Sequence, residues 1–423
     1  MSAPDRQSDA QVTAGAPPDR YARVLPALVE RFRASGVVGV VVVGAEELGR
    51  VERFYGDEAQ DRVAAALVAA LEEVWGDRRD AGDMLVRADE GRDEMALFLF
   101  RGKDEADFYG EGIATLVADI RVHLAKQGSR IFYPYTRVAP PVQVGWTLAL
   151  RNPVVADRRQ LRAAWQDARH DAELVGQLEA RVRKLSFQQV LLREDVTMLF
   201  EPIVNLSTRD VIGYEALARG PAGSEVQSPG AFFQRAEEAG LLFEADSLCR
   251  RRALDGAHGL APGIKLFLNC LPSAIRDPQF RGAEFQHLLE RLRLRPTDVV
   301  FEISERESIG NFAMFREARD HFASLGLGIA LDDTGVGYSS LEAVIELAPD
   351  FIKVDQVLVR SIDTDPPRQE LLRSLNAVAA KLGARVIAEG IETREELSTL
   401  QALGVPFGQG YLLGRAAPLR RDL

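Results

Sequence analysis

Six short apolar segments in the second half of the chain each end in, or are directly followed by, a carboxylate, an amide or a lysine. Each segment has the length and the Val, Ile, Leu and Phe content of a buried strand. The polar residues, in chain order, are Glu215, Asn269, Glu302, Asp332, Asp333, Lys353 and Glu389. Because the carboxyl ends of successive strands meet on one rim of an α/β sheet or barrel, we expect these side chains to share a site.

Carboxylates dominate this set, and placing them on one rim without a cation is unfavourable. Two unit charges about 4 Å apart repel by roughly 4 kcal/mol at an effective dielectric constant of 20. The sequence therefore predicts a divalent-metal site, and an all-oxygen donor set that includes the Asn269 amide favours Mg²⁺ or Mn²⁺ over zinc. The adjacent Asp332 and Asp333 could share a carboxylate between two ions, as in phosphoester hydrolases. Lys353 then supplies a positive charge for a phosphate or for the attacking water.

Each of these residues also has a simpler interpretation. A single Asp or Glu at a strand end is most often a helix cap or a turn residue. Asp333 could belong only to the turn that follows it, Lys353 and Asp355 could form a structural ion pair, and Gln409 could lie in a plain loop. The recurrence of the pattern in all six segments favours a shared site.

The segments between these strands have helical apolar spacing, and many of them end at Gly or Pro. We expect helices over residues 228–254, 284–294, 313–325, 339–347, 368–382 and 393–403. Repeated strand–helix units over about 230 residues predict a parallel sheet closed into a TIM-like (β/α)8 barrel, with an open doubly wound sheet as the alternative. No GxGxxG or GxxxxGKS/T sequence follows a strand, which argues against a nucleotide cofactor.

Residues 21–172 predict a smaller mixed α/β domain. Its β-branched segment Val37–Val43 is typical of a buried strand and is far shorter than the roughly 20 residues that cross a membrane. The other expected elements are helices at 22–34 and 59–75, hairpin strands at 83–87 and 94–100, a late strand at 142–150 and a helix around 161–168.

A further helix is expected over residues 172–192. Its apolar residues recur at helical spacing, at Leu174, Leu178, Val182 and Leu185. This helix could be a rigid lever or a dimer seam, and it could equally be a solvated connector with one apolar stripe. Residues 1–20 are rich in Ala, Pro, Asp, Gln and Ser and lack an apolar signal segment, so a disordered tail is expected there.

Composition narrows the class of protein. Among 423 residues, 63 Asp and Glu exceed 52 Lys and Arg, and the formal charge of -11 disfavours a nucleic acid polymer or an anionic membrane as partner. The two cysteines, Cys249 and Cys270, lack CxxC spacing, so a reducing cytoplasm is the expected location. The five histidines have no zinc-type spacing.

The second half of the chain resembles a known family. Tyr214–Arg219 is similar to the signature of EAL domains, which are cyclic di-GMP phosphodiesterases with a TIM-like barrel. The resemblance covers about residues 187–420 and continues through Asn269, Glu302–Glu305, Asp332–Ser340, Ile352–Asp355, Ala388–Glu392 and Gln409–Tyr411. It implies a cyclic-guanylate-specific phosphodiesterase that hydrolyses one phosphodiester bond of cyclic di-GMP to give linear pGpG.

The resemblance also implies roles for the matched residues. The ligands of two Mg²⁺ or Mn²⁺ ions would be Glu215, Asn269, Glu302 and Asp332 for the first ion, and Asp332, Asp333 and Glu389 for the second. The residues that position the attacking water would be Lys353 and Gln409. Leu217 and Arg219 would contact the dinucleotide, and Glu305 would anchor the loop after Asp333.

Two positions depart from the family pattern. The family has Gln where this chain has Glu201, and a carboxylate facing the substrate would repel phosphate unless it is protonated, metal-bound or turned away. The family has Phe where this chain has Thr334, in the loop that links the metals to dimer contacts. These substitutions motivate an alternative function, a module that binds cyclic di-GMP without cleaving it and acts through a signalling protein partner.

The first domain resembles the GGDEF fold of diguanylate cyclases. Its turn Gly91–Met95 aligns with that signature, and Val142–Thr147 aligns with a late strand of the family. Arg92 replaces a glycine beside the phosphates, Gly44 stands at a metal-binding Asp, and Glu52–Arg53 replace the pair that reads guanine. We therefore expect no cyclase activity and no GTP binding, and either a regulatory or dimerisation module or a plain scaffold.

The expected organisation is a disordered tail (1–20), a degenerate GGDEF-like domain (21–172), a linker helix (173–192) and an EAL domain (193–423). The expected ligand is cyclic di-GMP, and the expected assembly is a homodimer formed through the barrel and the linker helix.

Overall fold

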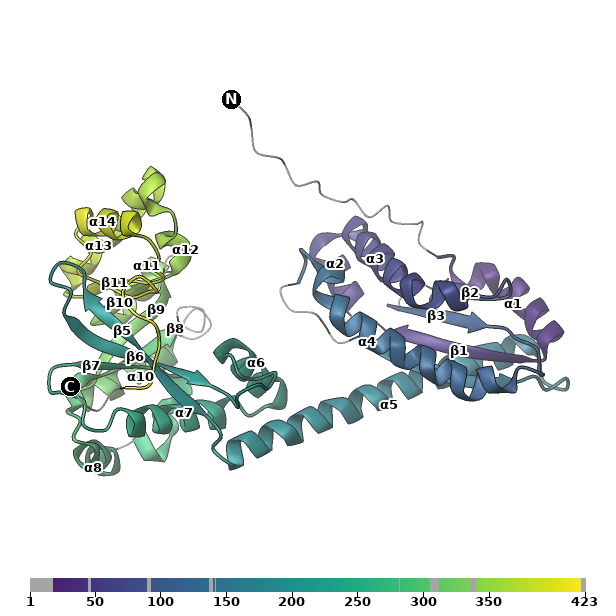
Figure 1. Ribbon diagram of the computed structural model, residues 1–423, viewed down its shortest axis with the longest axis horizontal. Coiled ribbons are helices and arrows are strands. Elements are labelled where there is room, and N and C mark those ends of the chain that lie inside the picture. The colour runs from purple at the N-terminus through teal and green to yellow at the C-terminus, as the bar shows by residue number, and fades with distance from the viewer. Residues whose placement is uncertain are drawn as a thin grey trace. The chain divides into compact units, whose positions relative to one another are not determined.

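The structure is a computed structural model that describes residues 18–44, 47–89, 93–136, 140, 142–280, 282–304, 312–334 and 340–419. The chain divides into two compact units, Met1–Val182 and Arg183–Leu423. The first unit contains a small antiparallel sheet and the second a closed barrel (Figure 1). No helix in the described part of the chain is both long and apolar enough to cross a membrane.

The first unit is built on a four-stranded sheet in the order β2-β3-β1-β4. Its strands are β1 (Val37–Gly44), β2 (Met84–Arg87), β3 (Glu94–Leu99) and β4 (Gln143–Leu150). Its helices are α1 (Tyr21–Ser35), α2 (Glu47–Tyr55), α3 (Asp57–Trp75), α4 (Ile113–Phe132), a 3-10 helix (Gly76–Arg78), a π-helix (Phe108–Gly112) and the first part of α5 (Asp157–Leu192), which continues past Val182 into the second unit. Each of the four strands begins and ends within one residue of the bounds predicted from the sequence.

Strand β1 lies in the middle of this sheet and faces two separate cores. Val41 and Val43 belong to a cluster with apolar residues of α3 and α4. Val40 and Val42 belong to a second cluster with α1 and the beginning of α5. This alternation follows from the two-residue period of a strand, and it explains why nearly all of β1 is buried.

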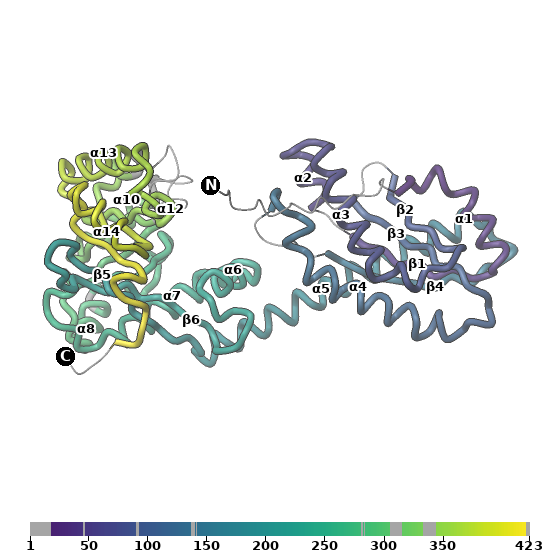
Figure 2. Tube along the Cα trace, turned by 45° about the horizontal axis from the view of Figure 1, so that its top comes forward, coloured from purple at the N-terminus to yellow at the C-terminus, as the bar shows by residue number. Residues whose placement is uncertain are grey.

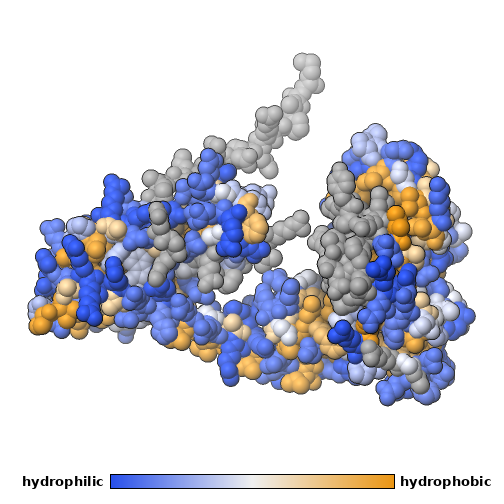
Figure 3. All heavy atoms as spheres, turned by 180° about the vertical axis from the view of Figure 1, so that it is seen from behind, coloured by the Kyte–Doolittle hydropathy of each residue, from blue (hydrophilic) through white to orange (hydrophobic). Residues whose placement is uncertain are grey.

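The helices of this unit differ from the sequence prediction in two respects. Helices α2 and α4 had no predicted counterpart. The helices expected around 161–168 and 172–192 form the single 36-residue helix α5, because residues 169–171 contain no helix breaker. In α5, the apolar residues Leu174, Leu178, Val182 and Leu185 are exposed. Figure 3 shows how hydrophobic residues interrupt the hydrophilic surface on one face of the molecule.

The second unit is a closed barrel in the order β10-β11-β12-β5-β6-β7-β8-β9. Figure 2 traces the chain of this unit, with β5 and β6 labelled. Neighbouring strands are parallel except at β5, which is antiparallel to both β6 and β12. The strands are β5 (Thr197–Asn205), β6 (Val211–Arg219), β7 (Lys265–Asn269), β8 (Val299–Ser304), β9 (Gly328–Thr334), β10 (Phe351–Val354), β11 (Arg385–Ala388) and β12 (Phe407–Gly408).

The predicted barrel closure is confirmed, but the reversed β5 corrects the expectation of an all-parallel sheet. Residues 206–210 connect β5 directly to β6. A parallel pair needs a crossover of about a dozen residues or more, so this short connection permits only a hairpin.

Helices alternate with the later strands. They are α6 (Pro229–Ala239), α7 (Leu242–Gly256), α8 (Gly282–Leu292), α10 (Phe312–Ser324), α11 (Ser340–Leu347), α12 (Gln356–Val359), α13 (Pro366–Leu382) and α14 (Arg394–Ala402). Short 3-10 helices occupy Pro272–Arg276, Pro278–Phe280, Pro296–Asp298 and Ile362–Thr364. The helix predicted over 228–254 is broken into α6 and α7 because Gly240 adopts φ 66° and caps α6 in the left-handed conformation.

Candidate active site

Apolar residues fill the barrel interior, and the polar residues predicted from the sequence follow them two positions later. The interior cluster contains Phe267, Val300, Ala330, Phe351, Ile387 and Phe407. Two positions after these stand, in the same order, Asn269, Glu302, Asp332, Lys353, Glu389 and Gln409. Side chains two residues apart on a strand point to the same face, so the polar residues form the next layer, at the carboxyl ends of the strands.

The hairpin β5–β6 adds two carboxylates to this layer. Glu215 on β6 pairs in register with Glu201 on β5. Because β5 runs in the opposite direction, Glu201 precedes the interior residue Ile203 by two positions instead of following it. Glu215 is buried and Glu201 is half-buried.

Lys353 lies at the centre of the layer, with a side chain that is 1% exposed. Its Nζ lies 2.7 Å from Glu389 Oε1, 2.9 Å from Glu302 Oε1, 3.1 Å from Glu215 Oε2 and 3.4 Å from Asp332 Oδ1. Burial alone would lower the pKa of Lys353, but the surrounding carboxylates outweigh it and raise the pKa well above its ordinary value. The side chain is therefore a buried ammonium.

Two amides orient Glu215. Gln409 Nε2 donates a hydrogen bond to Glu215 Oε2 at 2.6 Å, and Asn269 Nδ2 donates to Oε1 at 3.3 Å. Burial would raise the pKa of Glu215, but Lys353 and these hydrogen bonds together lower it. Glu215 therefore remains ionised.

Glu389, Glu302 and Glu201 bind protons more tightly. Burial, with repulsion from Asp332 and Glu215, raises the pKa of Glu389 to about 8 against the opposing effect of Lys353. Burial and then Glu215 raise the pKa of Glu302 well above its ordinary value. The pKa of Glu201 is raised for the same two reasons. The Lys353 ammonium does not neutralise this layer, so the layer favours the uptake of protons or of a further cation.

The donor set fits a divalent metal. Glu302 Oε2 and Gln409 Oε1 are buried and have no hydrogen-bond partner among the described residues, a situation that costs about 1–3 kcal/mol or more per group. Carboxylate and amide oxygens are the ligands that Mg²⁺ and Mn²⁺ accept. Within the described ranges, no three His, Cys, Asp or Glu side chains are already grouped as a metal site. The carboxylates point at Lys353 Nζ instead.

The two residues expected to contact a substrate lie on the same strand face as Glu215. Leu217 and Arg219 follow it at alternate positions of β6. Leu217 lines a cavity of about 50 Å³ together with Asn269 and Arg250. Arg219 donates to the carbonyl oxygen of Ala218 at 2.9 Å and is close enough to Glu201 to lower the pKa of that carboxyl.

Three positions from the sequence analysis cannot be placed by their side chains. Asp333 and Thr334 are described only through their backbone, which continues β9. Glu305 lies outside the described residues. Their roles stay predictions.

A buried ionic network behind Asn269 was not predicted from the sequence. Arg250 on α7 is 1% exposed, and it donates to Asp246 Oδ2 at 2.8 Å and to Asp277 Oδ2 at 3.2 Å. Asp246 Oδ1 accepts a hydrogen bond from the backbone N–H of Leu271 at 3.3 Å. The network therefore holds the backbone that follows Asn269 against α7.

Within this network, burial raises the pKa of Asp246 to about 6, although Arg250 opposes the rise. A signal was present in the sequence. Asp246 and Arg250 stand four residues apart, so they share the face of α7 that also carries buried apolar residues.

The fold and the site define the class of protein, an α/β barrel whose acidic polar site lies at the carboxyl ends of its strands. The EAL domain family matches residues 185–416, and the chain belongs to this family of cyclic di-GMP phosphodiesterases. Members of the family typically use divalent metals. The match does not extend to the sheet of the first unit.

The chain is similar to named relatives over part of its length. Over 239 residues it is 32% identical to the probable cyclic di-GMP phosphodiesterase PdeN of Escherichia coli (strain K12), a match that covers 54% of this chain and 44% of PdeN. Over 218 residues it is 28% identical to the blue light- and temperature-regulated antirepressor BluF of the same organism, covering 51% of this chain and 53% of BluF. The chain therefore spans about half the length of these curated relatives.

A solved structure supports the fold. The PaMucR phosphodiesterase in complex with cyclic di-GMP is similar with a TM-score of 0.50 and 25% sequence identity, over 56% of this chain and 97% of that chain.

Proposed function

We propose that the barrel hydrolyses one phosphodiester bond of cyclic di-GMP and releases linear pGpG, with two Mg²⁺ or Mn²⁺ ions. The observation that carries this proposal is the layer of four carboxylates around the Lys353 ammonium. PdeN is named a probable cyclic di-GMP phosphodiesterase, and PaMucR is named a phosphodiesterase in complex with cyclic di-GMP. These names supply the substrate class. The reaction would lower the level of a second messenger in bacterial signalling.

The oxygen donors divide between two ions in this proposal. The first ion would be held by Glu215, Asn269, Glu302 and Asp332. The second ion would be held by Asp332, Asp333 and Glu389. When bound, such a pair of ions supplies a hydroxide nucleophile at neutral pH and stabilises the charge on the attacking and leaving oxygens.

Lys353 and Gln409 would orient the attacking water. Lys353 can only donate hydrogen bonds, whereas Gln409 Oε1 accepts them and has no partner among the described residues. A donor and an acceptor together fix the orientation of one water molecule. Arg219 would hold a phosphate of the dinucleotide by charge, Leu217 would contact it through apolar surface, and Glu305 would anchor the loop after Asp333.

Turnover of the full chain tests the proposal. Purified protein is incubated with cyclic di-GMP and Mn²⁺, and the products are separated by chromatography. We expect pGpG to accumulate with the wild-type chain and not with Glu215→Ala. Wild-type turnover no faster than that of the variant would contradict the proposal.

Glu201 favours a second candidate function, a module that binds cyclic di-GMP and acts through a protein partner without cleaving it. The residue pairs in register with Glu215, so its carboxyl group stands beside the site. BluF, an antirepressor, is among the relatives. Calorimetry with cyclic di-GMP separates the two functions, because tight binding without pGpG would support the module and rapid turnover would exclude it.

For the first unit we propose a degenerate GGDEF-like domain that serves regulation or dimerisation. The element order β1-α2-α3-β2-β3-α4-β4 supports this proposal. Gly44 brings no carboxylate to the end of β1, and Glu52 and Arg53 lie on α2. The turn residues Gly91 and Arg92, of which Arg92 replaces the family's glycine, lie outside the described residues. Calorimetry of the full chain with GTP is expected to show no binding, and micromolar affinity would contradict the proposal.

The same proposal includes a homodimer, formed through the barrel and the linker helix, that works in the cytoplasm. The exposed apolar residues of α5 support a seam between helices. Light scattering on the full chain is expected to give twice the mass of one chain. A single-chain mass at every concentration would contradict the dimer.

A further inference from the structure

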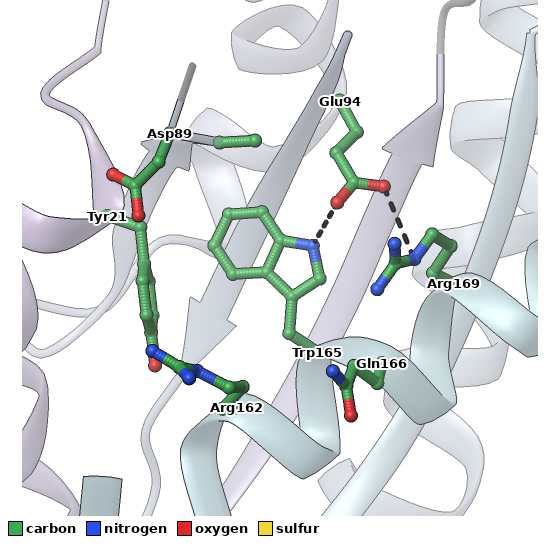
Figure 4. Close-up of a pocket in the computed structure, with 8 residues that line it drawn as sticks. Tyr21, Asp89, Glu94, Arg162, Trp165, Gln166 and Arg169 are labelled. Carbon is green, nitrogen blue, oxygen red and sulfur yellow. Dashed lines mark hydrogen bonds and ion pairs between the residues drawn. The ribbon is translucent and has the colours of Figure 1, made fainter. Parts of the chain in front are cut away.

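A pocket in the first unit is lined by residues that the proposed hydrolysis does not use. Its volume is about 260 Å³, and it lies where the beginning of α1, the β2–β3 hairpin and α5 meet (Figure 4). Helix α5 contributes Arg162, Trp165, Gln166 and Arg169. The rest of the lining is Tyr21, Ala88, Asp89 and Glu94.

The two carboxylates of the pocket are already bonded within the protein. Glu94 is 8% exposed, accepts a hydrogen bond from Trp165 Nε1 at 2.9 Å and lies 3.6 Å from Arg169 Nε. Asp89 Oδ1 accepts from the backbone N–H of Ala22 at 3.0 Å. Both carboxylates of the pocket therefore already have partners within the protein. The groups that a ligand could use are hydrogen-bond donors.

Two donors of the pocket lack an acceptor within the part of the chain that the structure describes. Tyr21 is 7% exposed, and its hydroxyl is buried without a hydrogen-bond partner among the described residues. Burial raises the pKa of Tyr21, so this hydroxyl keeps its proton and can donate. Figure 4 shows the hydroxyl end of Tyr21 beside the guanidinium group of Arg162. Arg162 makes no hydrogen bond or ion pair with another residue of the described ranges.

The pocket also has a fixed aromatic wall. The ring of Trp165 meets Tyr21 edge to face at a centroid distance of 5.0 Å and Phe98 at 5.7 Å. The hydrogen bond from its indole N–H to Glu94 fixes the ring further. A wall that is rigid before binding suits a flat apolar group, because little side-chain freedom is lost when the group docks.

We propose that this pocket binds a small anion that carries a flat ring, for which an aryl carboxylate is the simplest representative. The carboxylate would accept hydrogen bonds from the Tyr21 hydroxyl and the Arg162 guanidinium, and the ring would lie against Trp165. The volume of about 260 Å³ is below the roughly 300–1,000 Å³ of sites for drug-sized ligands, which selects small molecules. Because its donors come from α1 and α5, the bound anion stabilises the packing of these two helices.

Calorimetry on the full chain tests this site with sodium benzoate as the probe. We expect saturable binding at one site, and no binding of benzamide, which has the same ring and no charge. Arg162→Gln and Tyr21→Phe should each weaken benzoate binding by about tenfold or more, the effect of losing a hydrogen bond to a charged group. Arg181→Gln makes the same charge change elsewhere on α5 and should leave the affinity unchanged.

Thermal melting of each variant establishes that it is folded, and Tyr21→Phe keeps the packed ring. Absence of saturable benzoate binding to the wild-type chain would overturn the proposal. So would equal affinity for benzamide, or an affinity that neither Arg162→Gln nor Tyr21→Phe changes. None of these readouts uses turnover, so the outcome is independent of the proposed phosphodiesterase activity.

Discussion

The two units of the chain use buried charge in different ways. In the first unit, Asp83 pairs with Arg101 through both carboxylate oxygens. In the barrel, four carboxylates share Lys353. A balanced pair can serve the fold alone, whereas an unbalanced layer is unfavourable until something else binds to it. The comparison indicates that excess buried charge, more than buried charge itself, marks the functional site.

The largest effect is expected from removing the cation of the unbalanced layer. Lys353→Met should lower turnover of cyclic di-GMP by about a thousandfold, because the variant loses a positioned charge at the reacting group. The measurement is the rate of pGpG formation. Lys381→Met, at an exposed position of α13, is the control and should keep the wild-type rate. Equal rates in the two variants would remove Lys353 from the mechanism.

Breaking the balanced pair of Asp83 and Arg101 should lower the stability of the first unit and leave the turnover of cyclic di-GMP unchanged. Arg101→Met leaves the buried Asp83 without its cation and should destabilise the first unit by about 3 kcal/mol. This is the low end of the usual range, because Asp83 still accepts hydrogen bonds from the backbone of Asp80 and Phe100. Urea unfolding measures the loss. A parallel fall in turnover per folded molecule would show that this pair is more than structural.

The network behind Asn269 should have an intermediate effect on the site. Arg250→Leu removes the contact that holds Asp246, and with it the backbone after Asn269. We expect the Mn²⁺ concentration for half-maximal turnover to rise by about tenfold, as for other residues that support metal ligands. Arg250→Lys should restore part of the loss. An unchanged Mn²⁺ requirement with lower stability would make the network purely structural.

The unbalanced layer also predicts a pH dependence of stability in the metal-free chain. The pKa of Glu389 rises from 4.5 to about 8 on folding, so the folded state binds this proton more tightly than the unfolded state does. The resulting stabilisation is complete below pH 4.5 and is lost as the pH rises towards 8. Glu302 shifts in the same direction.

Thermal melting between pH 5 and pH 8 measures this effect, which should be a fall of a few degrees. Added Mn²⁺ should reduce the fall, because a bound cation replaces the proton. Stability that rises with pH over this window would contradict the assignment of excess negative charge.

The smallest effect is expected at the edge of the layer. Glu201→Gln removes a half-buried carboxylate that stands opposite Glu215. Turnover should rise on the order of threefold, because one fewer like charge at a partly solvated position changes the free energy by less than about 1 kcal/mol. The measurement is kcat at saturating cyclic di-GMP. A fall in kcat would show that the Glu201 carboxylate takes part in the reaction.

The barrel site could be predicted from the sequence because a strand repeats every two residues. Phe351 and Lys353, or Ile387 and Glu389, must face the same side, so an apolar run that ends in a polar residue already places that residue in the interior. Gln409 had no such signal, since β12 contains only Phe407 and Gly408, and its role was predicted from the family resemblance alone.

The structural features that could not be predicted from the sequence depend on contacts between segments that are separate in the chain. The burial of Arg250 requires Asp277 and the ring of Phe280, which lies 4.2 Å from its guanidinium group. The direction of β5 depends on the length of one connection, which the strand pattern itself does not contain. The pocket of the first unit joins Tyr21 to Trp165, and no local pattern relates these two residues.

The most direct test of the central claim is the rate of pGpG formation by the wild-type chain and by Glu302→Gln, each with Mn²⁺ and with a chelator. Glu302 is 1% exposed and carries a buried oxygen without a hydrogen-bond partner in the described residues, so its charge is the one that a metal would use most directly. We predict rapid product formation only by the wild-type chain with Mn²⁺. Equal rates with the chelator, or full activity in Glu302→Gln, would contradict the assignment of the acidic layer as a catalytic metal site.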